Sequence, residues 1–153
     1  MLAYAPVLLA GFLISGCTPL GIWVYEEPTV EVFDLAVDDS QEADYPIRIS
    51  LQVSNPNDFE VRLEQVEVAV ELNGASVVDR EVSTAALFVP GDRQTVVVAV
   101  AWRDVGSSLR PDSFGSGTHR YAVSGHAVLQ TPIGQRRIRF ERTGTGELRA
   151  GTT

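Results

Sequence analysis

The chain has 153 residues, a net charge of −8 and a single cysteine, and all twelve of its basic residues are arginines. This length suits one domain with an ordinary core, and a single cysteine excludes an internal disulfide, so stability must come from buried apolar side chains. The acidic excess argues against nucleic-acid binding, whose affinity comes from basic side chains that neutralise phosphates.

The N-terminus carries a candidate lipoprotein signal. Residues 1–16 hold no charged side chain and end in an aliphatic residue and two small residues before the only cysteine, Ile14-Ser15-Gly16-Cys17. A lipoprotein signal peptidase reads this pattern, so we expect cleavage after Gly16 and acylation of the Cys17 thiol, with palmitate or a similar chain. The predicted domain plan is a signal peptide at 1–16, a lipidated tether at 17–28, a β-domain at 29–148 and a frayed tail at 149–153.

The same stretch leaves one alternative open, an uncleaved membrane anchor. No basic residue precedes the apolar run, and its uncharged character continues as far as Tyr25. Pro6 and Pro19 interrupt the run, however, and a spanning helix needs about 20 apolar residues. We therefore favour a lipid anchor. Because Thr18 rather than aspartate follows Cys17, the expected location is the periplasmic face of the outer membrane.

From Thr29 onward, apolar and polar residues alternate as in strands with one buried face. A first strand is predicted to bury Phe33, Leu35 and Val37. After an acidic loop at residues 38–44, a second strand is predicted to bury Ile47, Ile49, Leu51 and Val53.

A third predicted strand, at about residues 61–72, changes phase in its middle. Val61 and Leu63 are at odd-numbered positions, whereas the apolar residues from Val66 to Leu72 are at even-numbered positions. A bulge near Glu64-Gln65 is therefore required to keep all of them on one buried face. Asn73-Gly74 then supplies a two-residue hairpin turn, because both residues tolerate positive φ. Val77 and Val78 begin the returning strand.

The most apolar stretch, residues 95–102, follows a turn at Pro90-Gly91-Asp92. Both of its faces are apolar, which predicts a central strand or one buried on both sides. After a loop at 104–118, a final hairpin is predicted to turn at Thr131 to Gly134, and its buried face holds Tyr121, Val123, Gly125, Ala127, Leu129, Ile138 and Phe140. No segment shows a helical period, so the predicted fold is all-β, an antiparallel β-sandwich.

One segment resembles a known family. Leu51-Gln52-Val53-Ser54-Asn55-Pro56-Asn57 is similar to the signature of the type 2 late-embryogenesis-abundant proteins, which share the WHy domain. The Asn73-Gly74 turn, the Val-rich strand after Pro90 and the Tyr121-x-x-x-Gly125 strand follow in the family's order. The resemblance covers residues 29–148. It implies a fibronectin- or immunoglobulin-like sandwich and a role in desiccation or osmotic stress.

The polar residues do not assemble into a predicted catalytic centre. Asn55-Pro56-Asn57 is interpreted as a structural corner, because proline ends strand pairing and asparagine side chains imitate backbone partners. His119 and His126 are seven residues apart and should point to opposite faces of a strand, which disfavours a metal site. We predict no catalytic residue, no metal and no cofactor.

The leading hypothesis is a non-enzymatic envelope lipoprotein that protects against desiccation or osmotic stress, anchored to the membrane through Cys17. The alternative is an interaction module that docks an envelope protein, a glycan or a lipid. Its candidate interaction patch is Arg136, Arg137 and Arg139, in the C-terminal part of the chain, where residues 113–153 hold six arginines and two acidic residues. The sequence leaves the oligomeric state and the identity of any partner open.

Overall fold

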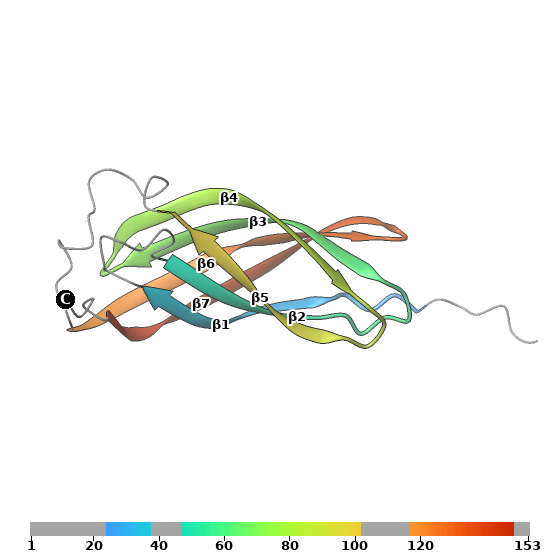
Figure 1. The fold of residues 1–153 in the computed structure, drawn as a ribbon, viewed down its shortest axis with the longest axis horizontal. Coiled ribbons are helices and arrows are strands. Elements are labelled where there is room, and N and C mark those ends of the chain that lie inside the picture. The colour runs from blue at the N-terminus through green and yellow to red at the C-terminus, as the bar shows by residue number, and fades with distance from the viewer. Residues whose placement is uncertain (1–23, 38–46, 102–116, 149–153) are drawn as a thin grey trace, which may run out of the picture.

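A computed structural model describes residues 24–37, 47–101 and 117–148 and shows a sandwich of two β-sheets (Figure 1). The predicted signal peptide with Cys17, the loop at 38–44, Trp102, residues 104–116 of the second predicted loop and the tail lie outside the described residues, whereas Gly117 and Thr118, predicted as loop, begin a strand. Seven strands follow one another along the chain: β1 Thr29–Val37, β2 Ile47–Ser54, β3 Val61–Leu72, β4 Ala75–Phe88, β5 Arg93–Val100, β6 Gly117–Thr131 and β7 Gly134–Leu148.

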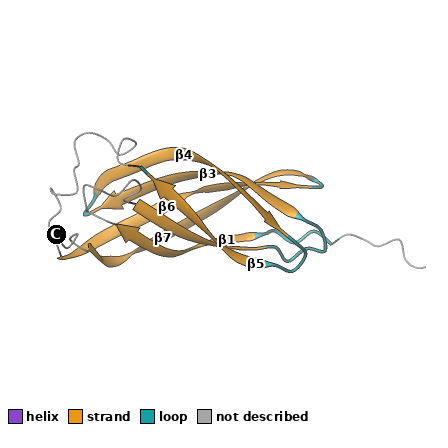
Figure 2. Ribbon diagram, viewed as in Figure 1, coloured by secondary structure: helices purple, strands orange, loops and turns teal. Residues whose placement is uncertain are grey.

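One sheet has three strands in the order β1-β2-β5, and the other has four in the order β4-β3-β6-β7. Every pairing is antiparallel. Within the described part of the chain there is no helix (Figure 2), as the absence of a helical period predicts. The predicted antiparallel β-sandwich is therefore confirmed.

The core lies between the two sheets and consists mostly of valine, isoleucine and leucine, the side chains that fit a pleated, half-buried surface best. β2 contributes the four apolar residues that the alternation predicts, and β6 and β7 contribute the predicted face of the final hairpin. The largest fully buried side chains are Phe88, Ile47, Ile49, Leu51, Leu63 and Leu129.

The predicted bulge in β3 is confirmed, whereas register shifts in β1 and between Val70 and Glu71 of the β3–β4 ladder were not predicted. β3 changes register between Leu63 and Gln65 against both β4 and β6. β1 does the same between Val32 and Asp34, which leaves Phe33 without a partner on β2. The prediction that Phe33 is buried with Leu35 and Val37 is therefore wrong. Val32 takes the inward position, Leu35 and Val37 are half-buried, and Phe33 is 61% exposed.

The prediction for residues 95–102 also needs correction. β5 pairs with β2 and forms an edge of the three-stranded sheet rather than its centre. Val98 and Val100 face the core, whereas Val97 is 54% exposed. The two apolar faces of this segment therefore do not reflect burial on both sides.

The edges of the two sheets meet at β1 and β7, where one arginine links them. The Arg142 guanidinium of β7 donates to the carbonyl oxygen of Val32 at 2.8 Å and also to that of Phe33. These carbonyls lie at the β1 bulge, where the ladder to β2 is interrupted. Arg142 thus supplies hydrogen bonds to edge carbonyls that would otherwise be open to another strand.

Candidate functional site

The chain leaves the sandwich toward its N-terminus at one end, which three connections also form (Figure 1). We call this the tether end. It consists of the lead-in segment (residues 24–28), the corner between β2 and β3 (55–60), the β4–β5 turn (89–92) and the β6–β7 turn (132–133). The Asn73–Gly74 turn between β3 and β4 lies at the opposite end, and both its residues have the predicted positive φ.

The buried side chain of Asn55 connects the β2–β3 corner with the β4–β5 turn. Its amide nitrogen lies 2.7 Å from the carbonyl oxygen of Phe59, 3.1 Å from that of Phe88 and 3.2 Å from that of Val89. Its backbone N–H donates to the carbonyl oxygen of Asp92 at 2.9 Å. The corner between β2 and β3 is therefore fastened to the β4–β5 turn, more than 30 residues further along the chain.

Asn57 extends the same network to the lead-in segment. Its side-chain oxygen accepts from the Glu26 N–H at 2.8 Å, and its amide nitrogen donates to the Glu26 carbonyl at 2.7 Å. That nitrogen and the Asn57 backbone N–H also donate to the Asn55 side-chain oxygen, at 3.2 and 3.1 Å. The side chains of both asparagines form most of their hydrogen bonds with backbone groups. This confirms the interpretation of Asn55-Pro56-Asn57 as a structural corner.

Tyr25 holds the lead-in segment at a second point. Its ring packs against the core and lies under the Arg136 guanidinium of β7, 5.3 Å from ring centroid to guanidinium carbon, within the range of a cation–π contact. Pro28 is buried just before β1 begins. The last residues of the predicted tether are thus part of the folded body.

The three arginines of the candidate interaction patch do not share one face. Arg136 pairs with Leu129, whose side chain is in the core, and it lies over Tyr25. Arg137 and Arg139 point to the outer face of the four-stranded sheet. There Arg137 pairs with Glu67, and Arg139 lies 2.6 Å from a Glu141 carboxylate oxygen. Adjacent carboxylates therefore offset the positive charge of two of the three.

The two histidines lie on opposite faces of β6, as predicted. His119 is buried, and its Nδ1 lies 2.8 Å from the Asn73 side-chain nitrogen. His126 is half-buried on the outer face, in register with Glu67 of β3 and Arg139 of β7. Among the described residues, no three histidine, cysteine or acidic side chains are grouped so that they could hold a metal ion.

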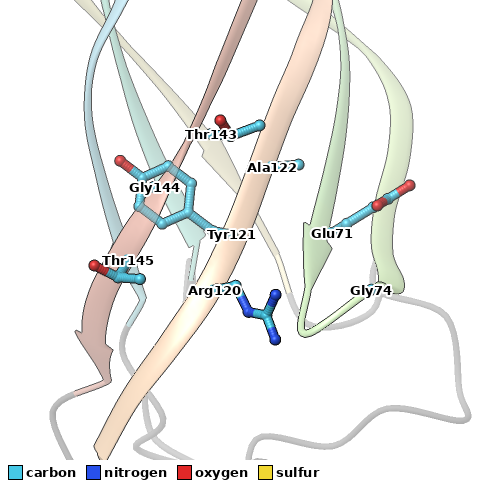
Figure 3. Close-up of a pocket in the computed structure, with 8 residues that line it drawn as sticks. All are labelled: Glu71, Gly74, Arg120, Tyr121, Ala122, Thr143, Gly144 and Thr145. Atoms are coloured by element: carbon cyan, nitrogen blue, oxygen red, sulfur yellow. The ribbon is translucent and has the colours of Figure 1, made fainter.

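A shallow groove of about 500 Å³ crosses β3, β6 and β7 near the end opposite the tether. The Tyr121 ring lies over Gly144, and Arg120 points to the other side of β6 (Figure 3). Its described lining is Glu71, Gly74, Arg120, Tyr121, Ala122, Thr143, Gly144 and Thr145. Among these described lining residues there is no histidine and no cysteine, and Glu71 supplies the one carboxylate.

Of the residues that sequence reasoning singled out, the structure brings the corner, Arg136 and the lead-in segment together at the tether end. The contact between Tyr25 and Arg136 was missed, and spacing in the sequence could not reveal it, because the two residues lie 111 positions apart. Within the ranges that the structure covers, no helix is long and apolar enough to cross a membrane.

A family model described as late embryogenesis abundant protein matches residues 50–144 of the chain. No curated protein matches it in sequence. The matched range begins in the middle of β2, includes the corner and the Asn73–Gly74 turn, and ends within β7.

Solved structures share the fold at low sequence identity. The solution structure of At2g46140.1, described as a late embryogenesis abundant protein, has a TM-score of 0.65 and 16% identity, over 82% of this chain and 73% of that one. The solution structure of AT1g01470 from Arabidopsis thaliana has a TM-score of 0.61 and 14% identity, over 78% and 80%. A crystal structure of a protein from Archaeoglobus fulgidus has a TM-score of 0.52 and 13% identity, over 81% and 97%.

Proposed function

The chain belongs to the late embryogenesis abundant protein family, and from this premise we propose that it is a non-enzymatic, lipid-anchored protein of the cell envelope that protects its surroundings during desiccation or osmotic stress. The observation that carries the proposal is the family match, which spans residues 50–144 and so most of the sandwich. The membrane location rests on the Ile14-Ser15-Gly16-Cys17 pattern, with the outer membrane as the proposed site.

The outer face of the four-stranded sheet suggests how such protection would work. β3 and β4 place Glu67, Glu71, Asp79 and Glu81 on this face. Carboxylates bind water strongly, and a surface rich in them resists association with its neighbours. A domain of this kind, held at a membrane, would separate proteins that crowd together as water is lost.

The anchor is tested by the intact mass of the full chain from the membrane fraction of a bacterial host. We expect the mass of residues 17–153 plus a diacylglyceryl or triacyl group. Cys17→Ala should keep its full-length mass, because the peptidase cleaves before a lipid-modified cysteine, whereas Thr18→Ala should be processed normally. A full-length, unmodified mass for the native chain would contradict lipidation and support the uncleaved anchor.

Protection is tested by drying a desiccation-sensitive enzyme with vesicles that carry the full chain. After rehydration, the enzyme should retain more activity than with vesicles and an equal mass of albumin. The combined variant Glu71→Gln, Asp79→Asn and Glu81→Gln should protect less, because the uncharged amides bind water less strongly than the exposed carboxylates they replace. Circular dichroism of this variant should show an unchanged fold. Retained activity equal to that with albumin would contradict a protective role.

A further inference from the structure

We infer that the tether end is a membrane-contacting surface, whose exposed apolar turns rest in the headgroup region of the bilayer that holds the lipid on Cys17. The inference rests on the proposed acylation of Cys17 and adds to it an orientation. The sandwich would stand on the membrane by its tether end rather than move freely above it.

Exposed apolar side chains gather at this end. Val24 in the lead-in segment, Val89 in the β4–β5 turn and Ile133 in the β6–β7 turn are 77%, 48% and 50% exposed. The corner between β2 and β3, the β4–β5 turn and the β6–β7 turn each also hold an exposed proline, namely Pro56, Pro90 and Pro132. At the opposite end the described turn is Asn73–Gly74, which is polar. Apolar tips surrounded by polar groups suit the interface between headgroups and acyl chains.

The length of the tether fixes which end can reach the bilayer. Six residues separate Cys17 from Val24, and a fully extended chain across that interval spans at most about 24 Å. β6 has 15 residues and is therefore about 50 Å long. Because the tether is about half the length of the sandwich, the opposite end cannot take the place of the tether end at the membrane surface.

The tether is also fixed where it enters the body. Two hydrogen bonds join Glu26 to Asn57, and Tyr25 is packed between the core and Arg136. No further length can be gained by releasing residues 25–28 without breaking these contacts. The domain therefore cannot swing away from the bilayer on a longer linker.

The charges at this end indicate which lipid it would tolerate. Glu26, Glu27, Asp58 and Glu60 are exposed near the apolar tips, against Arg93 at the start of β5 and Arg136 on Tyr25. This acidic excess repels anionic headgroups. The surface therefore fits a zwitterionic headgroup region, with apolar contact as the attraction.

The test uses the lipidated full chain in phosphatidylcholine vesicles, after its mass has shown the acyl group. Because the only native cysteine would carry the lipid, Ile133→Cys introduces a single free thiol for a polarity-sensitive dye. Val97→Cys is the matched control, since Val97 is 54% exposed but lies within β5, away from the tether end. We expect a blue-shifted emission from the dye at position 133, with loss of intensity when brominated lipid is used, and neither effect at position 97.

Equal, water-like emission from both positions in the acylated chain would overturn the membrane contact and leave lipidation intact. An unmodified mass at Cys17 would overturn both proposals. Addition of phosphatidylglycerol should reduce the blue shift at position 133. A larger shift with this anionic lipid would overturn the inference as well, because it would mean that the arginines rather than the apolar tips make the contact.

Discussion

Replacement of Asn55 by aspartate is expected to lower the free energy of unfolding by about 4 kcal/mol or more at neutral pH, since it leaves several buried groups without partners. A stable domain of this size has a total of about 5–15 kcal/mol, so the variant would lose about a quarter of its stability or more. The two side chains have nearly the same shape. The loss therefore measures the lost hydrogen bonds of the amide and the burial of a charge rather than packing.

The reason lies in what surrounds the Asn55 amide nitrogen. It faces the carbonyl oxygens of Phe59, Phe88 and Val89. A carboxylate oxygen in its place would meet three acceptors with no hydrogen to donate, and its charge would be buried. Only the acceptor role of the side chain, toward Asn57, would survive the substitution.

The deficit should depend on pH. Burial and three neighbouring carbonyl oxygens would raise the pKa of the new carboxyl in the folded state above about 3.9, its value in the unfolded chain. Above that pH the folded state holds a proton that the unfolded state has released, so the stability of the variant falls as the pH rises. Relative to the native chain, the loss is smallest below about pH 4 and grows toward pH 7.

Urea unfolding at several pH values, followed by circular dichroism, would measure this effect. Asn55→Ala should show a deficit that does not vary with pH relative to the native chain. If Asn55→Asp proved as stable as the native chain at pH 7, the corner would not hold the connections of the tether end together.

The alternation of apolar and polar residues predicts much of this fold, because each inward-facing position depends mainly on its own strand. The Asn73–Gly74 turn and the Glu64 bulge follow from local rules, positive φ and the parity of buried residues. The bulge at Phe33 could not be predicted in this way, because Phe33, Leu35 and Val37 are spaced two residues apart, as the buried residues of a regular strand would be. Likewise, apolar residues on both faces of β5 could not show that it is an edge strand.

The tether end was beyond prediction for a different reason. The local sequence predicts that Asn55 and Asn57 form a corner, but their partners Glu26, Phe88 and Val89 are more than 30 residues away. The arginines from Arg136 to Arg139 form one cluster in the sequence. Because successive side chains of a strand point to opposite faces, the fold divides this cluster between the two faces of the sheet. A side chain's partner across the sandwich depends on topology, which single-strand patterns do not contain.

Replacement of Gly125 by alanine has the second largest expected effect. We expect the free energy of unfolding to fall by about 3 kcal/mol or more, because the added Cβ atom would overlap backbone atoms of the neighbouring strand. A Cβ atom at Gly125 would lie 2.0 Å from the Glu67 carbonyl oxygen, 2.7 Å from the Phe140 ring and 3.0 Å from the Glu67 carbonyl carbon. β3 is the strand between β4 and β6. It cannot move away from Gly125 without disturbing its ladder with β4.

Gly146 on β7 is the matched control. A Cβ there would lie 3.7 Å from the Tyr121 ring, an ordinary contact, so Gly146→Ala should be neutral or should raise stability by about 0.5 kcal/mol, since alanine loses less backbone entropy than glycine. Thermal unfolding of both variants by circular dichroism makes the comparison. Phe140→Leu relieves only the ring contact and should not rescue Gly125→Ala, because the closest atom belongs to the backbone of Glu67. A full rescue, or equal melting temperatures for the two glycine variants, would show that the close approach of β6 to β3 does not explain the glycine at position 125.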